Sequence, residues 1–317
     1  MHPFFPLVRN PHLLTIAANF AVRNLDVRRF PVTPRYYQTE PDVQVLVHEQ
    51  RPHGHVRGEI VMVHGLEGSS AAGYMRSMAQ LALEHGYATH RTNMRSCGGT
   101  ESLCKTMYNA GLTSDTLAVI REIRGRYRHP IYLIGYSLGG NVSLKLAGEL
   151  GESAIGLIDG VCAVSTPIDL GASVQQMSRR ENRIYEWRFL SRLKERIRKR
   201  AESLPGVYDL DRLATAGTVY QFDDFITAPS FGFGTAENYY RTQSSRQFLP
   251  SIRIPTLLIQ AKDDPLIPFE IFESPEVQEN PCISLVAVEH GGHLGFLSNS
   301  TPRFWADQIL LQWIQQH

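Results

Sequence analysis

The chain has 317 residues, of which 43% are hydrophobic and 20% are charged, a composition that is typical of a globular protein and excludes a disordered, collagen-like or disulfide-scaffold chain. Its 32 Lys and Arg residues and 31 Asp and Glu residues leave a formal net charge of +1, so no overall field favours nucleic acid as a partner. The four cysteines form no C-x-x-C pair, and the sequence has neither a signal-peptide pattern nor a long apolar run, so we expect a soluble protein of the reducing cytoplasm.

From residue 43 onward, short apolar and β-branched runs alternate with longer amphipathic stretches. This alternation is typical of βαβ units and of a mostly parallel sheet whose two faces are covered by helices. We therefore predict an α/β fold. The predicted strands are residues 43–48, 59–64, 88–92, 131–135, 160–164, 256–261 and 284–288. The predicted helices are residues 71–85, 113–127, 138–150 and 302–316.

The alternation stops between residues 167 and 250, where a long basic helix, Gly and Pro turns and an aromatic-rich stretch replace it. We assign residues 1–166 and 251–317 to the α/β core and residues 167–250 to an inserted cap or lid.

Two features of the insertion bear on its partners. Residues 179–200 hold ten Lys and Arg residues against three Glu residues, a local charge of +7. A solvated helix face is the preferred interpretation of this charge, and weak contact with an anionic membrane surface or an acidic substrate is the alternative. Six aromatic side chains are expected mainly to form the core of the cap, with the lining of an acyl-chain site as the alternative. They are Trp187, Phe189, Phe231, Phe233, Tyr239 and Tyr240.

The most informative segment is Gly135-Tyr136-Ser137-Leu138-Gly139, which ends an apolar strand and opens a helix. In this setting a Gly-x-Ser-x-Gly pattern is typical of a sharp turn that lifts a nucleophilic serine above the sheet. The positive end of the helix also points to the place where an oxyanion forms during acyl transfer. Ser137 is therefore the candidate nucleophile, and the alternative is a serine that only caps the helix.

An earlier apolar strand runs into the small-residue loop HGLEGSS at residues 64–70. A loop in this position supplies the second backbone donor of an oxyanion hole. We expect the N–H groups of Leu66 and Leu138 to hold the oxyanion, although a simple turn would also explain the glycines. His64 lies at the strand's end and precedes the serine, so we interpret it as a histidine that braces the loop rather than as a base.

A nucleophilic serine needs a base, and the base needs a carboxylate that orients it. In the expected chain order, two carboxylates follow a predicted strand, at Asp263 and Asp264. Pro265 and Pro268 stiffen the loop after Asp264, so we favour Asp264 as the acid. Asp263 and Lys262 are expected to be solvent-facing neighbours.

Three histidines follow Asp264 in the chain: His290, His293 and His317. His293 comes after two glycines, in a loop that can reach across the sheet, and is the candidate base. His290 is expected to brace the loop, and the terminal His317 to be mobile. A metal site formed by His290 and His293 is disfavoured because no Cys or carboxylate cluster accompanies them, so we expect neither a metal nor a cofactor.

Taken together, these segments resemble the YheT-type branch of the α/β-hydrolases. The resemblance rests on residues 10–15, 64–69, 135–141, 222–224, 263–265 and 290–296. It implies the α/β-hydrolase fold, with an inserted, largely helical cap, and the roles of nucleophile, acid and base for Ser137, Asp264 and His293. One departure is Ser96, which follows Arg95 where the branch often has glycine.

The branch is similar to mammalian membrane-associated lipid hydrolases, which implies carboxylic esters with acyl chains as substrates. We therefore predict a serine esterase or lipase-like hydrolase that cleaves a small-molecule ester or lipid through an acyl-enzyme intermediate. The alternatives are acyl transfer to another acceptor on the same triad and a noncatalytic binding protein of the same fold. Acyl length, head group and oligomeric state are not predicted from the sequence.

Overall fold

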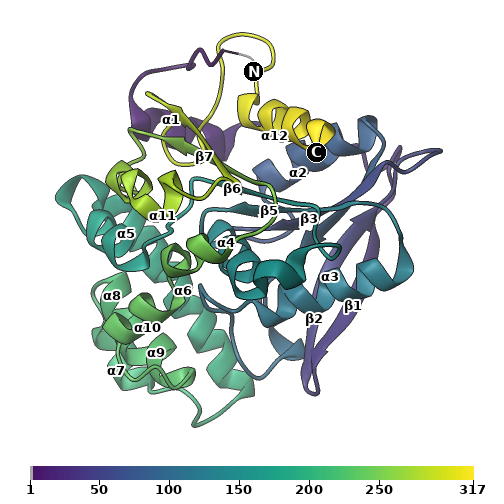
Figure 1. Cartoon of the computed structure of the whole chain (residues 1–317). Helices are drawn as coiled ribbons and strands as arrows, with labels where there is room; N and C mark the ends of the chain where they lie inside the picture. The colour runs from purple at the N-terminus through teal and green to yellow at the C-terminus, as the bar shows by residue number, and fades with distance from the viewer. Residues whose placement is uncertain (1–2) are drawn as a thin grey trace.

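The fold is built around one eight-stranded sheet. The computed structural model describes residues 3–317, and its strands follow the order β1-β2-β4-β3-β5-β6-β7-β8 (Figure 1). β2 pairs antiparallel with β1 and β4, and the other neighbouring strands pair in parallel. The strands are β1 (Thr33–Glu40), β2 (Val43–Gln50), β3 (Gly58–Val63), β4 (Tyr87–Thr92), β5 (Ile131–Tyr136), β6 (Gly160–Val164), β7 (Thr256–Ala261) and β8 (Ile283–Val288). The predicted α/β fold with a mostly parallel sheet is confirmed.

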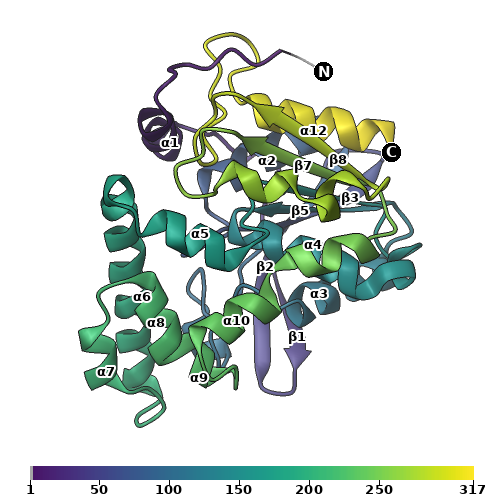
Figure 2. The same cartoon turned by 60° about the vertical axis from the view of Figure 1, so that its left-hand side comes forward.

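The helices lie on both faces of this sheet and in one large insertion between β6 and β7. Those of the core are α1 (Pro11–Phe20), α2 (Gly73–Glu84), α3 (Ser114–Arg126), α4 (Leu138–Leu150), α11 (Pro275–Gln278) and α12 (Trp305–Gln316). Those of the insertion are α5 (Leu170–Met177), α6 (Arg183–Ser203), α7 (Leu210–Thr215), α8 (Val219–Phe222), α9 (Ala228–Ser230) and α10 (Ala236–Gln243), with a π-helical turn over Asp223–Thr227. Most of the insertion lies to the lower left of the sheet in Figure 2. The predicted helical insertion is confirmed, while its boundaries at residues 167 and 250 stay a prediction.

Two hydrophobic cores lie on opposite faces of the sheet. α2 and α12 pack on one face, against side chains such as Ile60 and Met62. α3 and α4 pack on the other face, against Val61 and Val63. Successive side chains of a strand point to opposite faces, so β3 contributes to both cores, and its apolar run from Ile60 to Val63 follows from burial on both sides.

The basic charge of α6 is only partly solvated. Arg200 is buried and donates to three backbone carbonyl groups of residues 101–105. Arg196 pairs with Glu67 at 2.9 Å. The prediction of a solvated helix face is therefore wrong for these two arginines. The prediction holds for six exposed arginines of residues 179–200, which are Arg179, Arg180, Arg183, Arg188, Arg192 and Arg198.

Sequence analysis did not predict α1 and β1. β1 is a mostly exposed edge strand, in which only Tyr37 is fully buried, so it lacks the apolar run that marked the inner strands. α1 does carry a start signal, because Asn10 caps the N–H of Leu13 at 3.0 Å and Pro11 occupies the first turn. No helix in the described part of the chain has both the length and the apolar character needed to cross a bilayer.

Candidate active site

Ser137 occupies a strained turn between β5 and α4. Its backbone has φ +52° and ψ −122°, a conformation that L-residues rarely adopt and that lifts the side chain out of the strand-to-helix path. The flanking glycines are required by close backbone contacts. A Cβ on Gly135 would lie 2.3 Å from the carbonyl oxygen of Gly139, and a Cβ on Gly139 would lie 2.4 Å from that of Val63.

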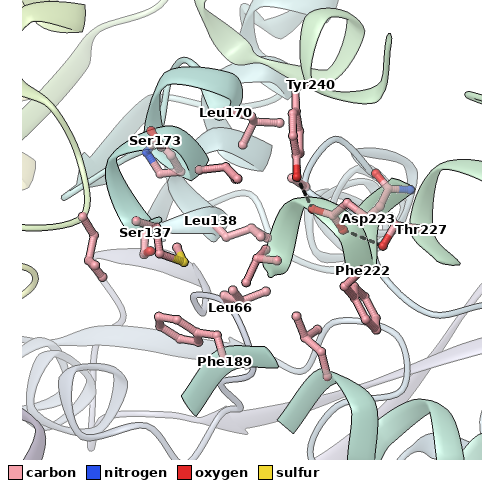
Figure 3. Close-up of a pocket in the computed structure, with 18 of the residues that line it drawn as sticks. Leu66, Ser137, Leu138, Leu170, Ser173, Phe189, Phe222, Asp223, Thr227 and Tyr240 are labelled. Carbon is pink, nitrogen blue, oxygen red and sulfur yellow. Dashed lines mark hydrogen bonds between the residues drawn. The ribbon is translucent and has the colours of Figure 1, made fainter. Parts of the chain in front are cut away.

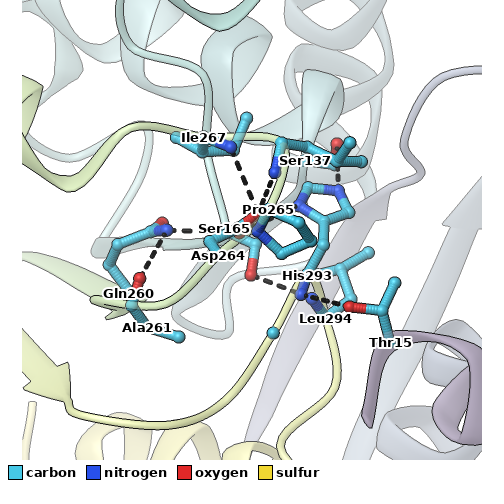
Figure 4. Close-up of polar contacts among 12 residues, drawn as sticks. Thr15, Ser137, Ser165, Gln260, Ala261, Asp264, Pro265, Ile267, His293 and Leu294 are labelled. Atoms are coloured by element: carbon cyan, nitrogen blue, oxygen red, sulfur yellow. Dashed lines mark hydrogen bonds and ion pairs between the residues drawn. The ribbon is translucent and has the colours of Figure 1, made fainter. Parts of the chain in front are cut away.

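The structure brings the three predicted triad residues into one line of contacts (Figure 4). His293 Nε2 lies 3.0 Å from Ser137 Oγ, and His293 Nδ1 lies 2.9 Å from Asp264 Oδ2. Ser137 follows β5, Asp264 follows β7 and His293 follows β8. The carboxyl ends of these parallel strands meet at one edge of the sheet. This arrangement allows His293 to accept the serine proton while Asp264 fixes the ring and its tautomer.

Asp264 is held by its surroundings as well as by His293. Its side chain is fully buried, and Oδ1 accepts the backbone N–H groups of Leu266 at 2.9 Å and Ile267 at 3.2 Å. The side-chain amide of Gln260 donates to Oδ2 at 3.2 Å. These donors compensate a buried negative charge, so the carboxylate can remain in place to face the histidine.

The loop that carries His293 is fixed by two side chains from distant parts of the chain. The backbone N–H of His293 donates to Thr15 Oγ1 in α1 at 2.9 Å, and that of Leu294 donates to Ser165 Oγ at 3.0 Å. Leu294 has φ +53°, so these bonds hold a strained segment. Thr15 and Ser165 are residues of the candidate site that sequence analysis missed.

Asp263 also binds this loop, so the prediction that it faces solvent is wrong. Its Oδ1 accepts the backbone N–H groups of Gly291 at 2.8 Å and Gly292 at 2.9 Å. Its Oδ2 lies 3.1 Å from His290 Nδ1, which confirms that His290 braces the loop. Lys262, in contrast, is exposed and pairs with Glu289 at the surface, as predicted.

The candidate oxyanion loop lies directly against the candidate nucleophile. A Cβ on Gly65 would be 3.0 Å from Ser137 Cβ, and both Leu66 and Leu138 line the cavity that contains Ser137. Leu138 is the first residue of α4, where a backbone N–H has no acceptor within the helix. The oxyanion role of Leu66 and Leu138 stays a prediction that this placement supports.

His64 braces the candidate oxyanion loop, as predicted. It is completely buried, with Nδ1 2.8 Å from the carbonyl oxygen of Gly65, and Nε2 accepts the N–H of Met94 at 3.1 Å. Burial lowers the pKa of His64 to about 4. The ring is therefore neutral at pH 7 and serves as a fixed spacer between the ends of β3 and β4.

Glu67 connects the same loop to the cap. It holds φ +54° and its carboxylate accepts from Tyr108 Oη at 2.8 Å and from the Arg196 guanidinium at 2.9 and 3.0 Å. Arg196 also donates to the carbonyl oxygen of Ser96. Ser96 has φ +58°, a backbone region that favours glycine.

Two spaces meet at Ser137. The first is a mostly apolar cavity with a volume of about 80 Å³. Figure 3 shows Ser137 and Asp223 on opposite sides of this cavity. The second is a larger cleft of about 380 Å³ between α1 and α6, lined in part by Arg188 and Arg192. His293 lines both spaces.

The six cap aromatics divide between core and site. Tyr239 and Tyr240 are buried and also line the apolar cavity, together with the half-buried Phe189. Phe231 and Phe233 are half-buried and pack against the core clusters. Trp187 is 69% exposed, so the prediction that it belongs to the cap core is wrong. Among residues 3–317, no group of three or more His, Cys, Asp and Glu side chains is arranged to hold a metal ion.

Comparisons with known proteins agree on the fold. The family described as "alpha/beta hydrolase fold" matches residues 59–300. The YheT protein of Escherichia coli is 30% identical over 296 residues, which cover 90% of this chain and 86% of that protein. A monoacylglycerol lipase of Saccharomyces cerevisiae is 28% identical over 265 residues, which cover 81% of this chain and 58% of the lipase. The solved structure of the Pyrococcus furiosus esterase Pf2001 has a TM-score of 0.61 at 17% identity, covering 100% of this chain and 99% of that one.

Proposed function

This chain belongs to the α/β-hydrolase fold family, and on that basis we propose that it is a serine esterase that cleaves carboxylic esters through an acyl-enzyme intermediate. The predicted resemblance to the YheT-type branch is confirmed, and the lipase among the chain's relatives supports the proposal. The single observation that carries the specific proposal is the line of contacts from Ser137 through His293 to Asp264.

Each residue of the candidate triad and each oxyanion donor has one role in the proposed reaction. His293 Nε2 takes the proton of Ser137 while Oγ bonds to the ester carbonyl carbon, and Asp264 stabilises the imidazolium that forms. The N–H groups of Leu66 and Leu138 hold the oxyanion. His293 then gives the proton to the departing alcohol. Water, deprotonated by the same ring, attacks the acyl-enzyme, releases the acid and restores the serine.

The two spaces at Ser137 favour different halves of the substrate. The apolar cavity suits an acyl chain, because burial of each methylene contributes about 0.8 kcal/mol. The cleft between α1 and α6 is larger and carries Arg188 and Arg192, so it suits the departing alcohol and the incoming water.

The proposal is tested with an activity-based probe and a substrate panel. A fluorophosphonate should label the wild-type protein and not the Ser137→Ala variant, and short p-nitrophenyl esters should be hydrolysed only by the wild type. Folded protein that neither labels nor hydrolyses any ester would support the noncatalytic alternative. Product analysis in the presence of competing alcohols separates hydrolysis from acyl transfer.

Location and surface contact also belong to this proposal. We propose that the protein is cytoplasmic, and the four free cysteines support this proposal.

We further propose that the exposed arginines of α6 bind the protein weakly to anionic lipid surfaces. Flotation with neutral and anionic vesicles tests this contact, and equal recovery with both kinds of vesicle would contradict it.

A further inference from the structure

One charged side chain in the apolar cavity has no part in the proposed reaction. Of the described residues that line this cavity, Asp223 is the only acidic one, and none is Lys or Arg. Asp223 lies across the cavity from Ser137 (Figure 3), in the π-helical turn that follows α8. Such turns are rare and often occur at functional sites.

The carboxyl group of Asp223 is only partly satisfied by the protein. Tyr240 Oη donates to Oδ2 at 2.7 Å, and Thr227 Oγ1 donates to Oδ1 at 2.6 Å. A carboxylate offers about four acceptor positions, so these two hydroxyl groups leave acceptor capacity beside the cavity. Burial raises the pKa of Asp223 to about 6, as expected for a carboxyl without a cationic partner.

The contacts of Asp223 within the protein do not use its whole carboxyl group. The neighbouring Asp224 forms a second link from the π-helical turn to α10, because its Oδ1 accepts the N–H of Ala236 at 2.9 Å. A Leu side chain at position 223 would complete the apolar lining, but it would leave the hydroxyl groups of Tyr240 and Thr227 without this acceptor. If a plain acyl chain displaced water from Asp223, the free acceptor positions of the carboxyl group would have no hydrogen-bond partner, which is unfavourable.

We infer that Asp223 is a specificity-determining residue that accepts a hydrogen bond from a hydroxyl group on the acyl part of the substrate. This inference rests on the proposed esterase function and names its substrate class: esters of hydroxylated acyl chains. A neutral hydroxyl suits the site because it supplies a donor without bringing a second ion that must also lose its water. The rest of the chain contacts the apolar lining.

The experiment compares p-nitrophenyl esters whose acyl chains have four to twelve carbons. For each length, the panel contains the plain ester and a series of esters with a single hydroxyl group at different positions of the acyl chain. The wild type should prefer one hydroxyl position over the plain ester of the same length by about tenfold in kcat/KM. Asp223→Leu should abolish this preference and hydrolyse plain esters at least as well as the wild type. Asp223→Asn should reduce the preference, and it decides the matter if Asp223→Leu does not fold.

The preference is the ratio of the kcat/KM values for the hydroxylated and the plain ester, both measured on the same protein preparation. The folded fraction of a variant therefore does not affect it. Asp224→Asn, in the same turn but outside the cavity lining, is the matched control and should keep the wild-type preference. Hydrolysis of plain esters without any hydroxyl preference, or a preference that persists in Asp223→Leu, would overturn this inference alone. Failure of the wild type to hydrolyse any ester would overturn the proposed function and this inference with it.

Discussion

Arg196 links the cap to the candidate oxyanion loop, and its replacement with Leu removes that link. Its guanidinium binds both carboxylate oxygens of Glu67 at 2.9 and 3.0 Å, and the two side chains are only 12% and 4% exposed. Removal of one partner from a buried pair leaves the other charge unpaired and typically costs about 3–5 kcal/mol. Tyr108 still donates to Glu67, so we expect the free energy of unfolding to fall by about 3 kcal/mol.

The same change should slow the reaction. Glu67 follows Leu66 directly and holds a strained backbone, so its release allows the proposed oxyanion donor to shift. Complete loss of one such donor lowers kcat by about 100- to 1000-fold. A displaced N–H still stabilises the oxyanion in part, so we expect kcat to fall by about ten- to hundredfold with little change in KM.

Urea unfolding and steady-state ester hydrolysis measure the two effects. Arg198→Leu is the matched control, since Arg198 lies two residues away on the same helix and is exposed. The double variant Arg196→Leu/Glu67→Gln should be more stable than Arg196→Leu, because it leaves no buried charge unpaired. Equal stability and equal kcat for Arg196→Leu and Arg198→Leu would refute this reasoning.

Three further predictions concern the triad and its supports. Asp264→Asn should lower kcat by about 10⁴-fold, because the amide can donate to His293 Nδ1 and thereby place the ring proton on Nε2, which faces Ser137; normal kcat would contradict it. His64 has a folded pKa of about 4, below its usual 6.5, so the unfolded chain takes up the proton first on acidification. Its contribution to stability is complete above about pH 6.5 and is lost as the pH falls toward 4, by about 2 kcal/mol between pH 7 and 5. Urea unfolding of His64→Asn should show a correspondingly weaker pH dependence, and an unchanged one would count against this account. Thr15→Val should lower kcat up to about tenfold by releasing the His293 loop, whereas Thr15→Ser should retain activity; equal kinetics of the two variants would argue against that role.

Sequence patterns predicted the inner strands and the candidate triad for definite physical reasons. β3, β5, β6 and β7 are buried on both faces, so apolar residues dominate their sequences. Ser137 is marked by the glycines that its turn requires. Asp264 and His293 follow from chain order and from the prolines and glycines beside them.

The supports of the site were missed because their partners are backbone groups far away in the chain. Thr15 accepts from the N–H of His293, 278 residues away, and Asp263 accepts from two glycine N–H groups. Arg200 in α6 donates to backbone carbonyls. Since every residue type presents the same backbone, these contacts leave no complementary pattern in the sequence.

The most direct measurement is the detection of an acyl group on Ser137. The wild-type protein is mixed with a p-nitrophenyl ester, quenched in acid within the first turnover and digested for mass spectrometry. We predict that the peptide containing Ser137 gains the mass of the acyl group, and that Ser137→Ala shows no such peptide and loses about a millionfold in kcat. Rapid hydrolysis by Ser137→Ala, or acylation of the wild type at another residue, would contradict the account.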